Sequence, residues 1–474
     1  MILGYPSPVI VNWGNTYDLD DDSKWLGNSH MSKITGTLEY LDFMSRKEAY
    51  EADRLMDDDL VLVVDAFDIW FQLPPEVLLQ RYHRTIQAAN ARLAEQWDSH
   101  GNSSVPMPME QTILISPQKR CWPGPSSHSD LSCDALPESP VREDLYGPDT
   151  DEDPENNYQH SRPRYINSGS IMGPVRDMRR FFRRANDKTE NHYSDGTQMS
   201  SDQGVFGEVW GEQEVWRTWA REQHRVGADK TGDRAQTLIQ SDFEYHVSLD
   251  YYEQLFVATV FHEEDVSLEK TGRAPVIFTL LTRYFSQGDI VKLNNRTAIE
   301  FESRYRNIPT RLDGLPDDIK GSPLPRQVAA VGLGQGHRRD WGDMPLYADF
   351  YSATVPAVIH HNAHINNLKT RRETWWDRIW FFPYLRQLME ERLQPGSLQV
   401  LAAITTKSGS NDITYRALLS DETKRKPRLF KSADFKSGVQ EAETFDGICS
   451  DWDPEREKKR RWFDEIFRDG NGPI

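Results

Sequence analysis

The stretch DDDLVLVVDAFDIWFQLPPEVLL, Asp57–Leu79, decides the expected fold because it joins a strand, two acids and a helix start. Residues Val61–Val64 are apolar without alternation, which is typical of a strand covered on both faces. Asp65 and Asp68 follow at once. Burying an unpaired carboxylate is costly. The two acids therefore predict a cation or strong hydrogen-bond donors beside them.

Further strand-like and helical segments extend this pattern in both directions. Strands are expected at Ser7–Trp13, Leu60–Ala66 and Gln111–Ser116, and a helix at Pro75–Trp97 that opens with proline. Alternating strands and helices predict the α/β class, with a mostly parallel sheet and helices on both faces. In such sheets ligands bind beyond the carboxyl ends of strands, which is where the two acids fall.

Composition and charge restrict the possible partners. The chain has 474 residues, of which 37% are hydrophobic, and a formal charge of -18, which argues against nucleic acid as a partner. The chain contains no run of about 18 apolar residues, so no membrane span is expected. The first residues lack the features of a signal peptide. Three cysteines are too few for a zinc cluster, although one disulfide between Cys121 and Cys133 is compatible with their spacing.

Composition shifts along the chain suggest its organisation. Residues 1–393 are expected to form one domain with long insertions. Within it, residues 124–161 are acidic and rich in Pro, Ser and Asn, which predicts a disordered insertion. Residues 262–347 form a second insertion without a clear pattern, and residues 394–474 read as a charged C-terminal tail.

Four short motifs carry candidate chemistry. The D-x-x-D strand end is followed by an N-S-G turn at Asn167–Gly169, a D-Q pair at Asp202–Gln203 and an H-x-N motif at His360–Asn362. These motifs could converge on one divalent metal and one diphosphate. Their carboxylate oxygens and one imidazole are ligands that suit Mn²⁺. Separately, each motif has an ordinary structural interpretation, such as a solvated loop for the acid pair or a helix cap for Asp202.

Six segments occur in the order found in a known family: WLGNSHMSK, VVDAFD, CWP, RYINSGSIMG, SDQGVF and VIHHN. Over about Tyr5–Leu393, with gaps, the chain resembles the GT-A glycosyltransferases. It is most similar to the glycosyltransferase domain of procollagen lysyl hydroxylases and its fungal relatives. The resemblance implies a Rossmann-like GT-A sheet. It also implies transfer of a hexose, glucose or galactose, from a UDP-sugar to a hydroxyl of a glycan or protein acceptor.

The resemblance also implies roles for individual residues. The ligands of Mn²⁺ or another divalent cation would be Asp65, Asp68 and His360. The donor-binding residues would be Lys33, Asn167, Ser168, Gly169 and Asn362. The catalytic pair beside the reacting carbon would be Asp202 and Gln203. The implied location is the lumen of the secretory pathway, Golgi or ER, with a membrane anchor there if an upstream segment exists.

Three departures from the family pattern keep other functions open. Gln118 stands where the family has a glutamate, Gly36 stands where an aromatic residue is expected, and the chain aligns from the family's second strand, so the first strand and helix are expected to be missing. A catalytically degenerate GT-A protein that binds a sugar or partner without turnover is one alternative. A haloacid-dehalogenase-like phosphatase is another, although its D-x-D motif differs from the D-x-x-D found here.

Overall fold

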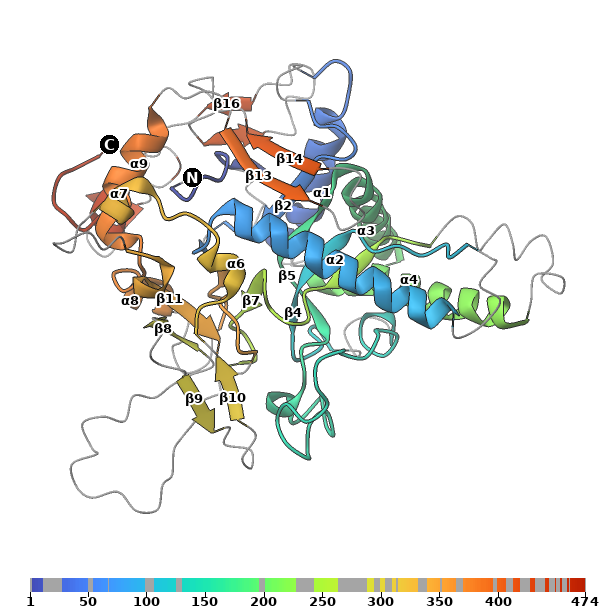
Figure 1. Ribbon diagram of the computed structural model, residues 1–474. Coiled ribbons are helices and arrows are strands. Elements are labelled where there is room, and N and C mark those ends of the chain that lie inside the picture. Colours follow the sequence, from blue (N-terminus) through green and yellow to red (C-terminus); the bar gives the residue numbers. More distant parts are fainter. Residues whose placement is uncertain are drawn as a thin grey trace. The chain divides into compact units, whose positions relative to one another are not determined.

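Figure 1 shows the computed structural model of the chain. The chain divides into two compact units. The described residues are 2–11, 28–49, 54–66, 68–98, 106–124, 130–195, 201–226, 243–262, 288–293, 299–302, 309–312, 314–330, 339–349, 352–363, 370–394, 399–405, 412–417, 427–430, 440–442, 448, 452–453, 458–459 and 461–473. One unit, Gly14–Ile69 with Arg81–Asp265, contains strand β4 (Ile113–Gln118); the other, Met1–Trp13 with Trp70–Gln80 and Val266–Ile474, contains β12 (Val358–His360). They are called the β4 unit and the β12 unit.

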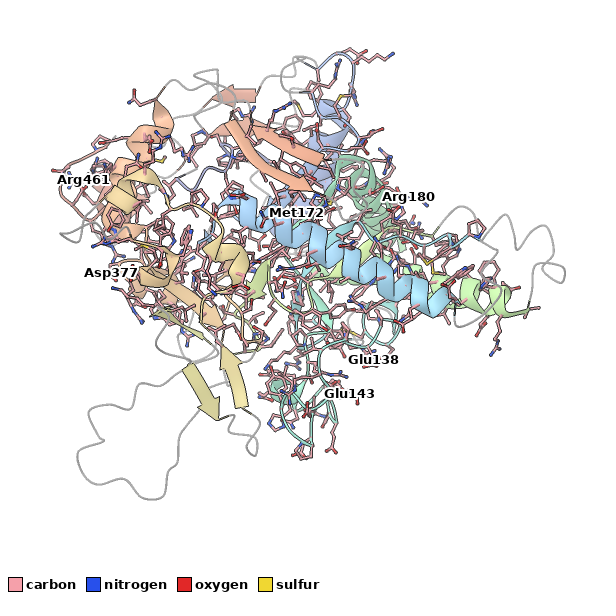
Figure 2. The ribbon with its side chains drawn as sticks, viewed as in Figure 1. Glu138, Glu143, Met172, Arg180, Asp377 and Arg461 are labelled. Atoms are coloured by element: carbon pink, nitrogen blue, oxygen red, sulfur yellow. A yellow bond between two sulfur atoms is a disulfide. The ribbon has the colours of Figure 1, made fainter. Side chains whose placement is uncertain are left out.

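The β4 unit is built on a mixed four-stranded sheet. Its strand order is β2 (Leu60–Val64), β5 (Tyr165–Pro174), β4, β6 (Val247–Leu249). Strand β5 is antiparallel to both β2 and β4, whereas β4 and β6 are parallel. Met172 of β5, labelled in Figure 2, pairs with Leu62 of β2 and Leu114 of β4. The α/β class is confirmed, but the expectation of a mostly parallel sheet is wrong for this sheet.

The direction of β5 follows from the connection that precedes it. Parallel neighbours need a crossover, usually a helix of a dozen or more residues. The described part of the connection between β4 and β5 contains only the short 3₁₀ helices η3 (Asp130–Ser132) and η4 (Tyr158–His160). The chain therefore returns beside β4 in the opposite direction.

Helices α1, α3 and α4 bury their apolar faces against this sheet. Their bounds are α1 (Asn28–Met44), α3 (Val175–Asp195) and α4 (Asp202–Val226). The predicted helix Pro75–Trp97 is confirmed as α2 (Pro75–Asp98). Phe181 and Phe182 of α3 contact Phe206 of α4, with ring centroids 5.1 and 5.3 Å apart. One apolar core thus holds α1, α3 and α4 together with β4 and β5.

Within the acidic segment 124–161, residues 130–161 adopt an ordered structure, which corrects the prediction of disorder. Arg162 donates hydrogen bonds to the Asp151 carboxylate, to the Ser139 carbonyl at 3.0 Å and to the Val141 carbonyl at 2.7 Å. Leu136 is 3% exposed and joins the apolar core. The mean composition of a segment does not reveal these contacts. A few buried side chains and one guanidinium group are enough to order a polar segment.

A disulfide closes the start of the same segment. Cys121 and Cys133 are bonded, with Cα atoms 5.7 Å apart, as their spacing allowed. The disulfide links the loop after β4 to the residue that follows η3, and η3 packs against α4. Gly211 of α4 lies so close to the Leu131 carbonyl that no side chain fits between them. The loop after β4 is therefore fixed against the helix that begins at Asp202.

The β12 unit contains short sheets and helices, some of them in segments that the sequence left without assignment. Its strand pairs are β1 (Val9–Val11) with β15 (Arg428–Phe430), β15 with β16 (Gln440–Ala442), β3 (Ile69–Phe71) with β12, β8 (Gly288–Lys292) with β11 (Pro345–Asp349), β9 (Ile299–Glu302) with β10 (Pro309–Leu312), β13 (Gln399–Thr405) with β14 (Asp412–Ala417), and β17 (Trp452–Asp453) with β18 (Lys458–Lys459). Its helices are α6 (Asp317–Lys320), α7 (Arg326–Ala330), α8 (Arg371–Thr374), α9 (Leu385–Leu393) and α11 (Trp462–Ile466). The predicted tail 394–474 thus contributes strands.

A buried amide holds the residue that follows β3 within the β12 unit. Gln72 is fully buried; its side chain donates to the carbonyls of Tyr347 at 3.0 Å and Pro356 at 2.6 Å and accepts from the Tyr347 N–H at 2.8 Å. The Gln72 N–H also donates to the Ala357 carbonyl at 3.0 Å. These bonds hold the end of β3 beside the start of β12. Among the described residues, no helix is long and apolar enough to cross a membrane.

The contact between η3 and α4 gives a stability prediction. A Cβ on Gly211 would lie 2.0 Å from the Leu131 carbonyl oxygen. Alanine is favoured over glycine in a helix by about 1 kcal/mol, but overpacking of this kind costs roughly 1–3 kcal/mol or more. We expect Gly211→Ala to lower the melting temperature by several degrees. The control is Gly124→Ala, because a Cβ there meets nothing within 4 Å. A Gly211→Ala protein as stable as the wild type would contradict the close packing.

Candidate metal and donor-binding site

Strand pairing brings the first acid of the D-x-x-D motif to the N-S-G segment. Val64, the last residue of β2, pairs with Ser170 of β5, and the Asp65 N–H donates to the Gly169 carbonyl at 3.1 Å. The N-S-G segment was expected to be a turn, but it lies inside β5. The register of β4 against β5 shifts between Ile115 and Ser116. A bulge of this kind re-aims side chains locally and is common next to functional sites.

Lys33 of α1 joins three of the predicted residues. Its ammonium group lies 2.6 Å from Asp65 Oδ1 and 2.8 Å from Asp202 Oδ2, and it donates to the Ser168 carbonyl at 3.1 Å. The Lys33 side chain is 15% exposed and the Asp202 side chain only 3%. Residues from α1, β5, the end of β2 and the start of α4 thus meet at one cation.

The charge of Lys33 is stabilised by its two partners. Burial alone lowers the pKa of a lysine, but the carboxylates of Asp202 and Asp65 outweigh it and raise the pKa of Lys33 well above its usual value. Asp202 is also the first residue of α4, where the helix dipole favours a negative charge. The ammonium group of Lys33 is therefore held between two acidic side chains.

Gln203 connects the start of α4 to β5 and to the loop after β4. Its side-chain oxygen accepts from the Ser168 N–H at 3.3 Å, and its side-chain nitrogen donates to the Trp122 carbonyl at 2.7 Å. Trp122 itself is 54% exposed. The sequence marked the C-W-P motif but not the exposure of this indole, which depends on the fold of the disulfide loop.

Asn167 forms its hydrogen bonds within the protein. Its side chain donates to Gln118 Oε1 at 3.0 Å and accepts from the Gly169 N–H at 3.2 Å, while Gln118 donates to the Arg120 carbonyl at 2.6 Å. Gln118 is buried. The position requires a side chain that both accepts and donates a hydrogen bond. A glutamine does both, whereas an ionised glutamate has no donor.

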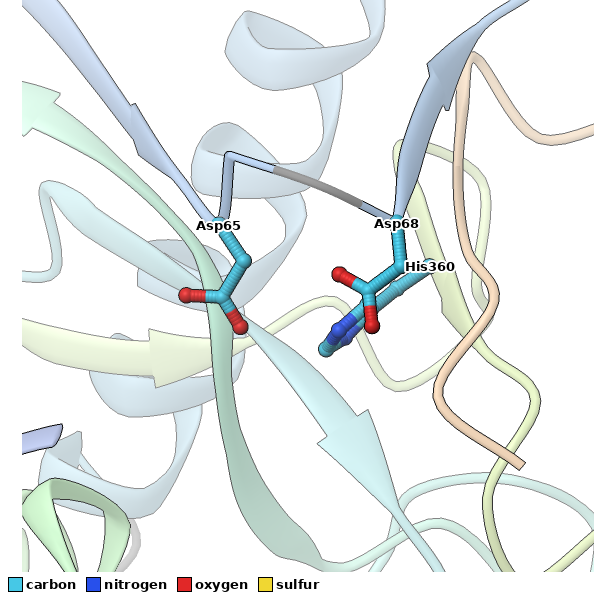
Figure 3. A group of neighbouring side chains, drawn as sticks. All are labelled: Asp65, Asp68 and His360. Carbon is cyan, nitrogen blue, oxygen red and sulfur yellow. The ribbon is translucent and has the colours of Figure 1, made fainter. Parts of the chain in front are cut away.

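The three predicted metal ligands form a group in the structure. Asp65 follows β2, Asp68 precedes β3 and His360 ends β12, and Figure 3 shows their side chains as neighbours. Each offers a ligand atom, and these atoms lie within 4.8 Å of one another. His360 is buried, whereas both acids are half-buried. Two carboxylates and one imidazole form a donor set that fits Mn²⁺ and related divalent ions.

The remaining predicted residue is Asn362. It lies two residues after His360 and is half-buried. The structure thus brings Lys33, Asp65, Ser168, Asp202 and Gln203 into one network of hydrogen bonds and ion pairs, with Asn167 and Gly169 beside it. The place of Asn362 in the site is a prediction from the H-x-N motif.

The comparisons with known proteins do not identify the chain. No protein-family model matches it, and no curated protein sequence matches it closely enough to count as a relative. The family resemblance therefore rests on the six motifs and on the way the fold brings several of them together.

The role of Gln118 can be tested by restoring an acid. In Gln118→Glu an ionised carboxylate would face the Arg120 carbonyl, which now accepts a hydrogen bond at 2.6 Å. Such a buried mismatch costs about 1–3 kcal/mol. Protonation would restore a donor, so the pKa of the new acid should rise on folding. The variant should therefore be destabilised at pH 8 and recover as the pH falls toward 5.

The measurement is urea denaturation of both proteins at the two pH values. Gln87→Glu is the matched control, because Gln87 is exposed on α2. A Gln118→Glu protein that equals the wild type at pH 8 would show that the position tolerates an ionised acid.

Proposed function

We propose that this chain is a metal-dependent hexosyltransferase of the GT-A type, which transfers glucose or galactose from a UDP-sugar to an acceptor hydroxyl. The observation that carries the proposal is the convergence on Lys33. Residues 33, 65, 168 and 202 come from four different motifs, yet Lys33 contacts all three of the others. This convergence of four separate motifs on one side chain supports a shared site.

The chain's own residues have chemistry suited to this reaction. Asp65, Asp68 and His360 would hold Mn²⁺ or another divalent cation, which when bound supplies positive charge that stabilises a departing diphosphate. Lys33 adds a fixed positive charge at the same place, suited to the same anion. Asp202, which is paired with Lys33, and Gln203 would lie beside the reacting carbon of the donor sugar. Ser168 and Gly169 would line the donor sugar, as the family resemblance implies.

The proposed partners and location follow from the same reaction. The donor is a UDP-sugar, and the acceptor is a hydroxyl of a glycan or protein. The Cys121–Cys133 disulfide supports the lumen of the secretory pathway, because disulfides persist in oxidising compartments.

The second candidate is a degenerate GT-A protein that binds a sugar or a partner without turnover. Gln118 favours it, because this buried amide stands where the resembling family has an acid and is engaged with Asn167 and the Arg120 carbonyl. The sugar pocket would then lack one negative charge.

The proposal predicts a response to metal that depends on the D-x-x-D acids. Mn²⁺ should raise the melting temperature of the wild type by mass action and support UDP release from UDP-glucose or UDP-galactose. The double variant Asp65→Asn/Asp68→Asn should lose both responses. The measurements are thermal melts up to millimolar Mn²⁺ and a UDP-release assay with each donor, with EDTA as the metal-free reference.

A matched control exists at the other end of the same strand. Asp57 and Asp58 precede β2 and are exposed, so Asp57→Asn/Asp58→Asn changes the charge equally without touching the site. It should behave as the wild type. An unchanged Mn²⁺ response in the Asp65/Asp68 variant would refute the ligand assignment. Mn²⁺ binding without UDP release from either donor would favour the degenerate protein.

A further inference from the structure

One ammonium group balances two carboxylates that belong to different parts of the site. Lys33 Nζ lies 2.6 Å from Asp65, a candidate metal ligand, and 2.8 Å from Asp202, the first residue of α4. The Asp65 side chain is 30% exposed, so it can be reached from solvent, whereas Lys33 and Asp202 are largely buried. A cation that reached Asp65 from solvent would therefore share this carboxylate with the buried Lys33.

A divalent cation at Asp65 would interact with both charges behind it. The positive charge of Lys33 opposes the cation, and the negative charge of Asp202 attracts it; at separations of a few ångströms in a partly buried site both effects are substantial. Asp202 also draws the ammonium away from Asp65. The two residues should thus change cation affinity in opposite directions, although neither is a ligand.

We propose that Lys33 and Asp202 together set the cation affinity of Asp65 and transmit metal binding to the start of α4. When a cation binds Asp65, the interaction between Asp65 and Lys33 weakens, and the ammonium group interacts mainly with Asp202. The next residue, Gln203, contacts both the Ser168 N–H and the Trp122 carbonyl. Metal occupancy is then coupled to the first turn of α4 and to the disulfide loop. This inference rests on the proposed metal site and adds its regulation by two residues that do not bind the metal.

The test is the Mn²⁺ affinity of charge variants, measured by calorimetry and by the electron paramagnetic resonance signal of free Mn²⁺. Lys33→Met should tighten Mn²⁺ binding, and Asp202→Asn should weaken it. Partners of metal-ligating side chains typically change affinity by about 10–100-fold, so we expect changes on the order of tenfold in each direction. Lys33→Gln keeps an N–H donor for the Ser168 carbonyl and should change affinity in the same direction as Lys33→Met.

The β4 unit offers a matched control of the same chemistry. Lys188 is also buried between two acids, 3.3 Å from Glu208 and 3.0 Å from Glu212. Lys188→Met removes an equivalent charge in the contact between α3 and α4 and should leave Mn²⁺ affinity unchanged. Circular dichroism of every variant checks that it is folded, and Asp202→Asn serves as an independent test if the lysine variants do not fold.

The outcomes separate this inference from the proposed function. Failure of the folded wild type to bind Mn²⁺ would overturn the metal site and the inference with it. Mn²⁺ binding by the wild type with equal affinity in the Lys33 and Asp202 variants would overturn the inference alone. Changes of the same sign in Lys33→Met and Asp202→Asn would also overturn it, because they would reflect general loosening of the site.

Discussion

The site depends on the ammonium group of Lys33, because the fold places Asp202 where water is scarce and Asp65 beside it. An isolated buried carboxylate would cost several kcal/mol or take up a proton. One lysine, held also by the Ser168 carbonyl, compensates both acids at distances below 3 Å. Without that cation, α1, β5 and α4 would bring uncompensated negative charge together. The packing of these elements and the charge of the site are thus one constraint.

Several parts of this arrangement could be predicted from the sequence. The apolar run Leu60–Val64 and the proline at Pro75 specify β2 and α2 locally, because strand burial and helix initiation leave direct traces in residue type. The candidate site residues could be named because they occur in ordered motifs. Their role as metal and donor ligands remains a prediction, whereas the contacts of Lys33 with Asp65, Ser168 and Asp202 are features of the structure.

Other features could not be predicted because they depend on distant partners. The antiparallel direction of β5 accompanies a connection whose described part contains only short 3₁₀ helices. The order of residues 130–161 depends on Arg162, which supplies donors to carbonyls up to 23 residues earlier. Averages of composition cannot represent one well-placed guanidinium. Nor does the sequence show that Lys33, from a motif of its own, lies between Asp65 and Asp202, since that requires α1 to pack beside both β5 and α4.

The far side of α4 is as important to the site as its first turn. Gly207 and Gly211 allow η3 to approach the helix closely, and η3 is directly followed by Cys133, which is bonded to Cys121. The next residue, Trp122, offers its carbonyl to Gln203. The start of α4 is therefore held from two directions, by Lys33 through charge and by the disulfide loop through close packing. A catalytic or binding pair at Asp202–Gln203 needs both, because a hydrogen-bond donor is useful only where its position is fixed.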